Sequence, residues 1–153
     1  MITAQVEQFA DCQTELAAIF PLHWGELAKF KDRMPLMPQY GEYVRRNEAG
    51  GLLLITVRVD GQVMAYYTVQ IAPGFHYETT LTATMDLCYI HPEVRNKGLS
   101  APLFRAVEKE LRRRGVKLWF SGFKEHSPLD MPVLLNLFGF KPSDAYWSKW
   151  LGD

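Results

Sequence analysis

The sequence predicts a mixed protein of the α+β class, in which helices flank a mostly antiparallel sheet. The first sign is a hairpin: Asp60-Gly61, a favoured two-residue turn, joins two β-favouring runs, residues 52–59 and 62–71. The second sign is a further β-favouring run, residues 79–90, which leads through a short polar loop into an amphipathic helix. Runs with helical spacing before and after these strands supply the flanking helices.

Before the hairpin, the chain predicts two helices. Residues 11–31 place apolar side chains at helical spacing, and Pro21 is expected to break that helix. A second helix is predicted over residues 38–48, and Gly50-Gly51 ends it. The loop between them, residues 34–38, is rich in methionine and proline. Such a loop either lines a pocket or plugs a core, and the sequence leaves both readings open.

After the hairpin, Pro92 stops the third strand, because proline has no N–H to donate to a sheet. The helix beyond the polar loop has Pro102 in its first turn and Gly115 just past its end. The remaining predicted elements are a strand over residues 117–122, a helix over residues 129–138 and a closing strand over residues 146–151.

The polar loop after the third strand carries the most informative motif of the chain, Arg95-Asn96-Lys97-Gly98-Leu99-Ser100. The order strand, loop, helix places backbone N–H groups at a helix start, beside the cations of Arg95 and Lys97. Such a place binds phosphate oxygens. The two common glycine-rich nucleotide motifs, the P-loop and G-x-G-x-x-G, do not occur in the chain.

This loop resembles the R-x-x-G-x-[GA] loop of the GNAT N-acetyltransferase superfamily, with Ser100 where the family usually has Gly or Ala. The preceding residues 89–95 (YIHPEVR) are similar to the family's strand-Pro-Glu-x-Arg approach. The order of predicted elements is also that of the GNAT fold, whose central, mostly antiparallel sheet splays open between two strands. The resemblance implies one GNAT-like acetyltransferase domain over residues 1–153.

The resemblance further implies acetyl-CoA as the cosubstrate, an amine as the acceptor, and direct transfer without a covalent enzyme intermediate. The residues expected to hold the pyrophosphate are Arg95, Asn96, Lys97, Gly98, Leu99 and Ser100. Backbone N–H groups near Cys88 and Ile90 are expected to hold the pantetheine arm and the acetyl oxygen. The acceptor, a small molecule or a protein, is not readable from the sequence.

A second resemblance concerns the proton donor. Residues 134–142 are similar to the family's helix that ends in Leu-Gly-Phe, where many members carry a tyrosine that protonates the departing CoA thiolate. In this chain Leu135 stands at that position. Three alternatives therefore stay open: another acid such as Tyr146, a proton from solvent, or weak catalysis. The competing reading of Tyr146 is a core aromatic residue of the last strand.

Asp86 is the preferred candidate for the general base. A charge inside a β-favouring run is costly unless it is paired or functional, although Asp86 could also face solvent or pair with an arginine. His126, between the fourth predicted strand and the last helix, is either a second candidate base or a plain polar loop residue. His23 and His76 are expected in loops near the acceptor, without a partner identifiable by spacing.

Composition argues against several classes of protein. Lys+Arg and Asp+Glu both number 17, so the formal net charge is zero and bulk attraction to nucleic acid or anionic membranes is not expected. The two cysteines lie far apart and form no metal pattern, so no metal is expected. The chain has no apolar run of membrane-spanning length and no signal-peptide pattern at its start, which predicts a cytoplasmic location. The apolar ending, residues 146–151, would permit a homodimer.

The predicted function is acetyl transfer by a GNAT N-acetyltransferase, and two alternatives stay open. The first is a GNAT-fold module that holds CoA, or nothing, and acts through protein contacts; Leu135 and Ser100 favour it. The second is an acyltransferase that modifies nucleic acid. The basic run Arg112–Arg114 favours that reading, although such a run at a helix end is more often solvated.

Overall fold

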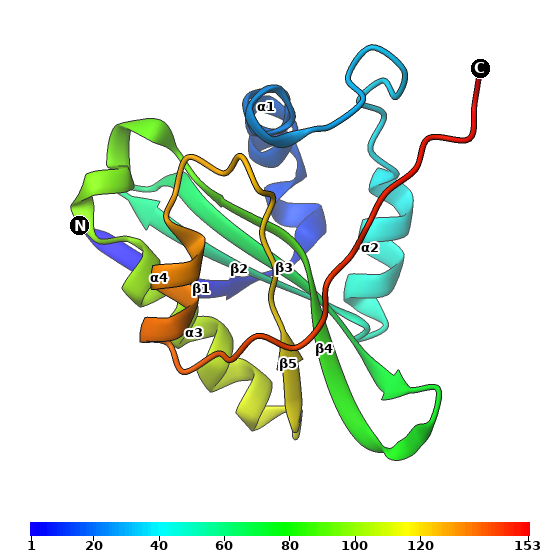
Figure 1. Ribbon diagram of the computed structural model, residues 1–153. Coiled ribbons are helices and arrows are strands. Elements are labelled where there is room, and N and C mark those ends of the chain that lie inside the picture. The colour runs from blue at the N-terminus through cyan, green and yellow to red at the C-terminus, as the bar shows by residue number, and fades with distance from the viewer.

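A five-stranded sheet forms the centre of the protein, which a computed structural model describes over residues 1–153 (Figure 1). The strands lie across the sheet in chain order: β1 (Ile2–Glu7), β2 (Leu52–Val59), β3 (Gln62–Gly74), β4 (Tyr77–Ile90) and β5 (Leu118–Phe120). Strands β1 to β4 are antiparallel, and β5 joins β4 in parallel. The prediction of a mixed fold with a mostly antiparallel sheet is confirmed.

Helices cover both faces of this sheet (Figure 1). They are α1 (Phe9–Leu27), α2 (Tyr40–Glu48), α3 (Ser100–Arg113) and α4 (Met131–Leu137), and a 3-10 turn, η1 (Pro92–Lys97), precedes α3. Helices α1 and α2 share one buried cluster with the sheet, whereas α3 and α4 share another on the opposite face. None of the helices combines the length and the apolar character that a membrane crossing requires.

Strand β2 shows how the two layers are held to the sheet. Side chains of a strand alternate between its faces, so Leu53 and Ile55 enter the cluster with α3 while Leu52 and Leu54 enter the cluster with α1. Full burial of each such side chain contributes about 1.5–3 kcal/mol to folding. The run is continuous in apolar residues because both faces of the strand are covered.

The sheet opens between β4 and β5. The two strands pair only where Thr82–Thr84 meet Leu118–Phe120. Beyond this point β4 continues to Ile90 along β3 alone, while the chain after β5 forms a loop, residues 121–130, which rises toward α1 before α4 begins (Figure 1). The splayed sheet expected from the sequence is therefore present.

Two features of the N-terminal part differ from prediction. Pro21 does not break the first helix, because Phe20 and His23 on either side of it are both buried and hold α1 against the sheet. Strand β1 was not predicted, because both Ile2 and Val6 stay exposed and the strand shows no apolar alternation. Pairing with β2 at the edge of the sheet holds β1 in its extended conformation.

The predicted closing strand over residues 146–151 is wrong. The chain after α4 has no regular structure, and the Tyr146 and Trp147 side chains are more than nine-tenths exposed. Aromatic residues favour strands only where a neighbouring strand pairs with them, and none pairs with this segment. The sheet ends at β5.

Candidate active site

A β-bulge lies in β4 at the point where the sheet opens. Thr68 of β3 pairs with Leu87, but the next residue, Val69, pairs with Met85. Asp86 is therefore the extra residue of β4. A bulge turns one side chain away from the regular alternation of the strand, and bulges are frequent beside active sites.

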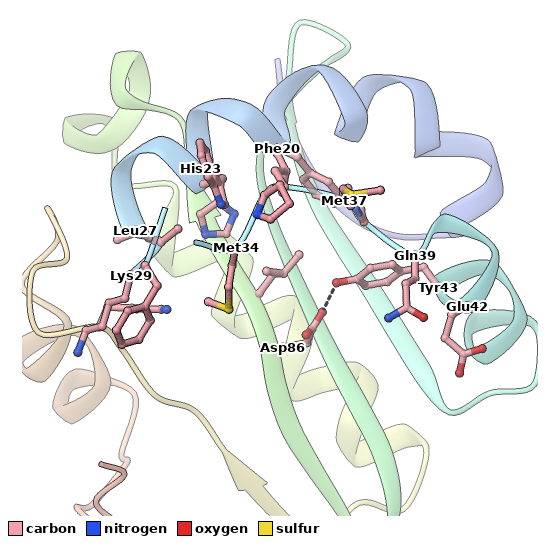
Figure 2. Close-up of a pocket in the computed structure, with 18 of the residues that line it drawn as sticks. Phe20, His23, Leu27, Lys29, Met34, Met37, Gln39, Glu42, Tyr43 and Asp86 are labelled. Atoms are coloured by element: carbon pink, nitrogen blue, oxygen red, sulfur yellow. Dashed lines mark hydrogen bonds between the residues drawn. The ribbon is translucent and has the colours of Figure 1, made fainter. Parts of the chain in front are cut away.

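The Asp86 carboxylate is held by two hydroxyl groups. Tyr43 of α2 donates a hydrogen bond to it at 2.8 Å, and Thr68 donates a second to the same oxygen at 3.0 Å (Figure 2). No arginine or lysine forms an ion pair with Asp86, so the alternative that it pairs with an arginine is wrong. The carboxylate is oriented by neutral donors and keeps a free oxygen.

The open edge of β4 presents backbone N–H groups. Leu87 donates its N–H to a threonine hydroxyl of β3 (3.0 Å), and His91 donates to the carbonyl oxygen of Met64 (2.8 Å). Because successive N–H groups of a strand point to opposite sides, those of Cys88 and Ile90 point away from β3, into the opening toward β5. The predicted pair of backbone donors thus faces a gap and not a neighbouring strand.

The loop after β4 ends at a helix start that has no side-chain cap. Gly98 adopts the left-handed conformation (φ +72°), which favours glycine, and turns the chain from η1 into α3. Helix α3 begins after Leu99 with no side-chain cap and no acidic residue in its first turn. Ala101 donates its N–H to the Gly98 carbonyl oxygen (3.4 Å) and Pro102 has no N–H, so the open amides beside Lys97 are those of Gly98, Leu99 and Ser100; anions are favoured at such a helix start.

Arg95 occupies a different place from the rest of this loop. Its Nε donates to the carbonyl oxygen of Ile90 at 3.0 Å, and its guanidinium forms an ion pair with Glu26 of α1. The guanidinium also lies over the Tyr89 ring, 5.9 Å from its centre. Arg95 thereby joins the end of β4 to α1, and its charge is already matched by a carboxylate.

Two cavities meet at Asp86. The larger, of about 690 Å³, lies between α1, the loop before α2, α2 and β4 (Figure 2). The smaller, of about 110 Å³, lies between the open edge of β4 and the loop before α4. The residues that line both are His23, Leu27, Asp86, Leu87 and Lys124. A group held at the open edge of β4 therefore lies next to whatever fills the larger cavity.

The loop over residues 34–38 lines the larger cavity along its whole length, which decides between the two readings of this loop. Met34 and Met37 reach over the cavity from it (Figure 2). Unbranched methionine side chains adapt to ligands of irregular shape. The wall they form is soft and apolar.

His23 is a residue of the site that the sequence placed only roughly. It lies in α1, and its Nδ1 is 2.6 Å from the Tyr66 hydroxyl. Burial, together with the positive charge of Lys124, lowers the pKa of His23 from 6.5 to about 4, so the imidazole is neutral at neutral pH. The missed signal was the helical spacing of Leu16, Phe20 and His23, which continues across the proline.

The structure does not bring the other predicted catalytic residues to the cavities. His126 is exposed in the loop before α4, and Tyr146 is exposed after α4; neither lines a cavity. Leu135 is buried in the cluster under α4, so no acid stands at that position. Tyr89, which the sequence did not single out, lines the smaller cavity and has a buried hydroxyl without a hydrogen-bond partner.

Comparison with known proteins identifies the family. The sequence profile of the acetyltransferase (GNAT) family matches residues 11–128, which include the bulge, the open edge of β4 and the loop before α3. The chain belongs to the GNAT family. The predicted resemblance is confirmed, and the protein is an acetyltransferase by family. No curated protein matches the chain in sequence.

Solved structures share the GNAT fold at low sequence identity. A ribosomal-protein-alanine N-acetyltransferase from Brucella melitensis biovar Abortus 2308 has a TM-score of 0.77 at 15% identity, over 100% of this chain and 99% of that one. An aminoglycoside acetyltransferase from an uncultured soil metagenomic sample has a TM-score of 0.76 at 10% identity, over 99% of each chain. A predicted acetyltransferase from Clostridium acetobutylicum, crystallised with acetyl-CoA, has a TM-score of 0.69 at 14% identity, over 99% of this chain and 97% of that one.

The GNAT site contains no metal-binding arrangement: no group of three or more histidine, cysteine, aspartate or glutamate side chains in the structure is placed to hold an ion. Its polar groups are instead the open amides of β4, the Asp86 carboxylate and the neutral imidazole of His23. These groups suit proton transfer and the binding of a polarised carbonyl.

Proposed function

We propose that this GNAT protein transfers an acetyl group from acetyl-CoA directly to an amine. The observation that carries the proposal is the junction at Asp86, where a carboxylate in a ligand-sized cavity adjoins the unpaired amides of Cys88 and Ile90. Direct transfer requires these two features side by side, because the amine must lie against the carbonyl carbon that it attacks.

The chain fits acetyl-CoA at two places. The Cys88 and Ile90 amides offer two donors in line along one strand edge, suited to the pantetheine arm and to the acetyl oxygen, on which negative charge develops during attack. The start of α3, which has no side-chain cap, offers the N–H groups of Gly98, Leu99 and Ser100 to a diphosphate. Because Glu26 already matches Arg95, the loop amides and Lys97 carry this contact, while Arg95 positions the end of β4.

Asp86 is assigned the role of general base. An amine acceptor is protonated at neutral pH and must lose a proton before or during attack. Asp86 lines the larger cavity, and the hydroxyls of Tyr43 and Thr68 orient its carboxylate through one oxygen and leave the other without a hydrogen bond. His126, the other predicted base, requires a movement of its loop to reach the amine.

The proton for the departing thiolate is assigned to a hydroxyl at the smaller cavity. Tyr89 lines that cavity, whereas the predicted acid Tyr146 does not. We expect Tyr89→Phe to lower kcat and to alter the basic limb of its pH profile, and Tyr146→Phe to leave both unchanged. The reverse result would return the role to Tyr146 and to a movement of the C-terminal segment.

A thermal-shift titration with acetyl-CoA tests the binding step, with the two ends of α3 as matched sites. Gly98 and Gly115 both have left-handed backbones (φ +72° and +82°), and no atom lies within 4 Å of a Cβ placed at either. We expect Gly98→Trp to abolish the rise in melting temperature and Gly115→Trp to preserve it. Saturation about a hundredfold above Kd stabilises a protein by about 2.7 kcal/mol, which is readily measured. No shift in the wild type would contradict the proposal.

A second candidate function is a GNAT-fold module that binds CoA without transferring the acetyl group. The buried Leu135 favours it, because the family's usual proton donor is missing from that position. Free-thiol release across a panel of amines separates the two candidates: release supports the enzyme, and acetyl-CoA binding without release supports the module. A cytoplasmic location and a homodimer stay predictions, testable by cell fractionation and light scattering.

A further inference from the structure

We infer that the acceptor is an amine whose apolar body carries a carboxylate, and not a polycation. The inference rests on the proposed function for the amine end of the ligand, which lies at Asp86. The rest of the ligand is inferred from the charges and the walls of the larger cavity.

The first step is an inventory of the charged side chains that line the larger cavity. Glu42 and Arg46 belong to this lining but satisfy each other: the Arg46 Nε is 2.6 Å from the Glu42 carboxylate, and Arg46 also donates to Gln70 at 3.0 Å. The charges without an ion-pair partner are Asp86, Lys29 and Lys124. The open cavity therefore offers one free negative charge and two free positive charges.

The second step is where these charges lie. Asp86 lies on β4 and Lys29 at the end of the cavity beyond Met34, so that the methionine stands between them (Figure 2). Lys124, in the loop before α4, is close enough to His23 for its charge to help lower the pKa of that histidine. Lys124 also lines the smaller cavity, at the junction where Asp86 lies, so Lys29 alone marks the far end of the larger cavity.

The third step is the surface between the two ends. Apolar side chains that line the cavity include Phe20, Leu27, Phe30, Met34 and Met37, and of these Leu27 and Met34 lie on the Lys29 side of Asp86 (Figure 2). These offer no hydrogen bonds and favour an aliphatic or aromatic body. A polycation would place a second ammonium against Lys29 or Lys124, where like charges repel. A carboxylate on the far end of an apolar amine is attracted there instead.

Calorimetry with matched ligands tests the inference. The pairs are 6-aminohexanoate with hexylamine, and phenylalanine with phenethylamine, each titrated into the full chain in the presence of coenzyme A. We expect the carboxylate to tighten binding by about tenfold in at least one pair, as two partly exposed charge pairs allow. The double variant Lys29→Gln/Lys124→Gln is expected to lose that gain and to bind the plain amines as the wild type does.

Lys31→Gln is the matched control, because Lys31 donates to the Gly25 carbonyl and does not line the cavity. Equal or weaker binding of the carboxylates in both pairs, or a preference that survives in the double variant, would overturn the inference. Thiol release measured in parallel reports separately on the proposed function. Selective binding without thiol release would uphold the ligand class while refuting catalysis. Thiol release only with plain amines or with a polycationic aminoglycoside would uphold catalysis while refuting the ligand class.

Discussion

The two halves of strand β4 differ in a way that separates stability from function. In the lower half, Thr82–Thr84 pair with β3 on one side and with β5 on the other, and Ala83 is fully buried. In the upper half, Leu87–Ile90 pair with β3 alone and line the smaller cavity, and the bulged Asp86 and Leu87 line both cavities. One strand thus belongs to the core at one end and to the site at the other.

In the upper half of β4, the sheet leaves backbone N–H groups unpaired on the side toward β5. Buried N–H groups are nearly always satisfied, so amides at an open strand edge mark a place that a ligand or solvent must fill. The bulge at Asp86 lies at the boundary between the halves and turns a carboxylate toward that place. Changes to the polar groups of the upper half should therefore affect activity, whereas changes around the lower half, and to buried side chains that pack on the upper half, should affect stability.

The largest expected effect comes from Asp86→Asn in the upper half. The amide oxygen still accepts from Tyr43 and Thr68, but the residue no longer takes a proton. We expect kcat/KM for the acetyl transfer to fall by about 10²–10³-fold with little change in the free energy of unfolding. Steady-state thiol release and urea unfolding measure the two. Full activity in a folded variant would remove Asp86 from the mechanism.

Next in size is a pH-dependent loss of stability from His23, which stacks on Tyr89 of the upper half. As the pH falls, the unfolded chain protonates this histidine near pH 6.5, whereas the folded protein resists until about pH 4. The stability that the neutral imidazole contributes is complete above pH 6.5. It is lost as the pH falls to about 4, and the free energy of unfolding drops by about 3 kcal/mol in all.

Urea unfolding at a series of pH values measures this loss. We expect His23→Gln to flatten the dependence of the free energy of unfolding on pH over that window. His126→Gln, at an exposed histidine, is the control and should keep the wild-type slope. A slope unchanged by His23→Gln would show that the imidazole is not buried in its neutral form.

A smaller effect is expected from Tyr67→Phe, which weakens the contacts around the lower half of β4. The Tyr67 hydroxyl accepts from the Trp119 indole at 3.0 Å and donates to Ser121 at 2.8 Å, so it ties β3 to β5 and to the residue after it. We expect the free energy of unfolding to drop by about 1–2 kcal/mol, because two groups lose their partner. The affinity for acetyl-CoA, measured by calorimetry, should stay the same; a large loss would show that the two halves are coupled.

The smallest effect is expected from Tyr43→Phe, which removes one of the two donors to Asp86. The carboxylate keeps its bond from Thr68 and loses only part of its orientation. We expect kcat to fall by about three- to tenfold, equivalent to one hydrogen bond of about 1 kcal/mol. Glu48→Gln on the same helix, at an exposed residue that lines neither cavity, is the control and should leave kcat unchanged.

Much of the fold could be predicted from the sequence, because its signals are local. The Asp60-Gly61 turn has the positive φ angles (+49° and +87°) that a tight hairpin needs, and the loop before α3 has its glycine at the left-handed position. The edge strand β1 carries no such local signal, because its extended conformation depends on pairing with β2, which is far along the chain. The prediction of a strand over residues 146–151 is wrong for the same reason: the aromatic residues there favour a strand, but no strand of the sheet pairs with them.

The residues of the site likewise divide into those that the local sequence predicts and those that depend on tertiary packing. Asp86 was detectable as a charge in an apolar strand, and Cys88 and Ile90 followed from the resemblance to the GNAT family. The Arg95 ion pair with Glu26 and the position of His23 depend on how α1 lies on the sheet, which no short motif records. His126 and Tyr146 are polar groups of plausible type whose distance from the cavities could only be seen in three dimensions.

The central claim is that the open edge of β4 receives the acetyl-bearing arm of acetyl-CoA. Backbone amide chemical shifts during an NMR titration test it most directly, because they report on the donors themselves. We predict large shifts for Cys88, Ile90 and the first residues of α3, with Thr82–Thr84 nearly unmoved. Saturable binding that leaves the Cys88 and Ile90 amides unshifted would contradict the account.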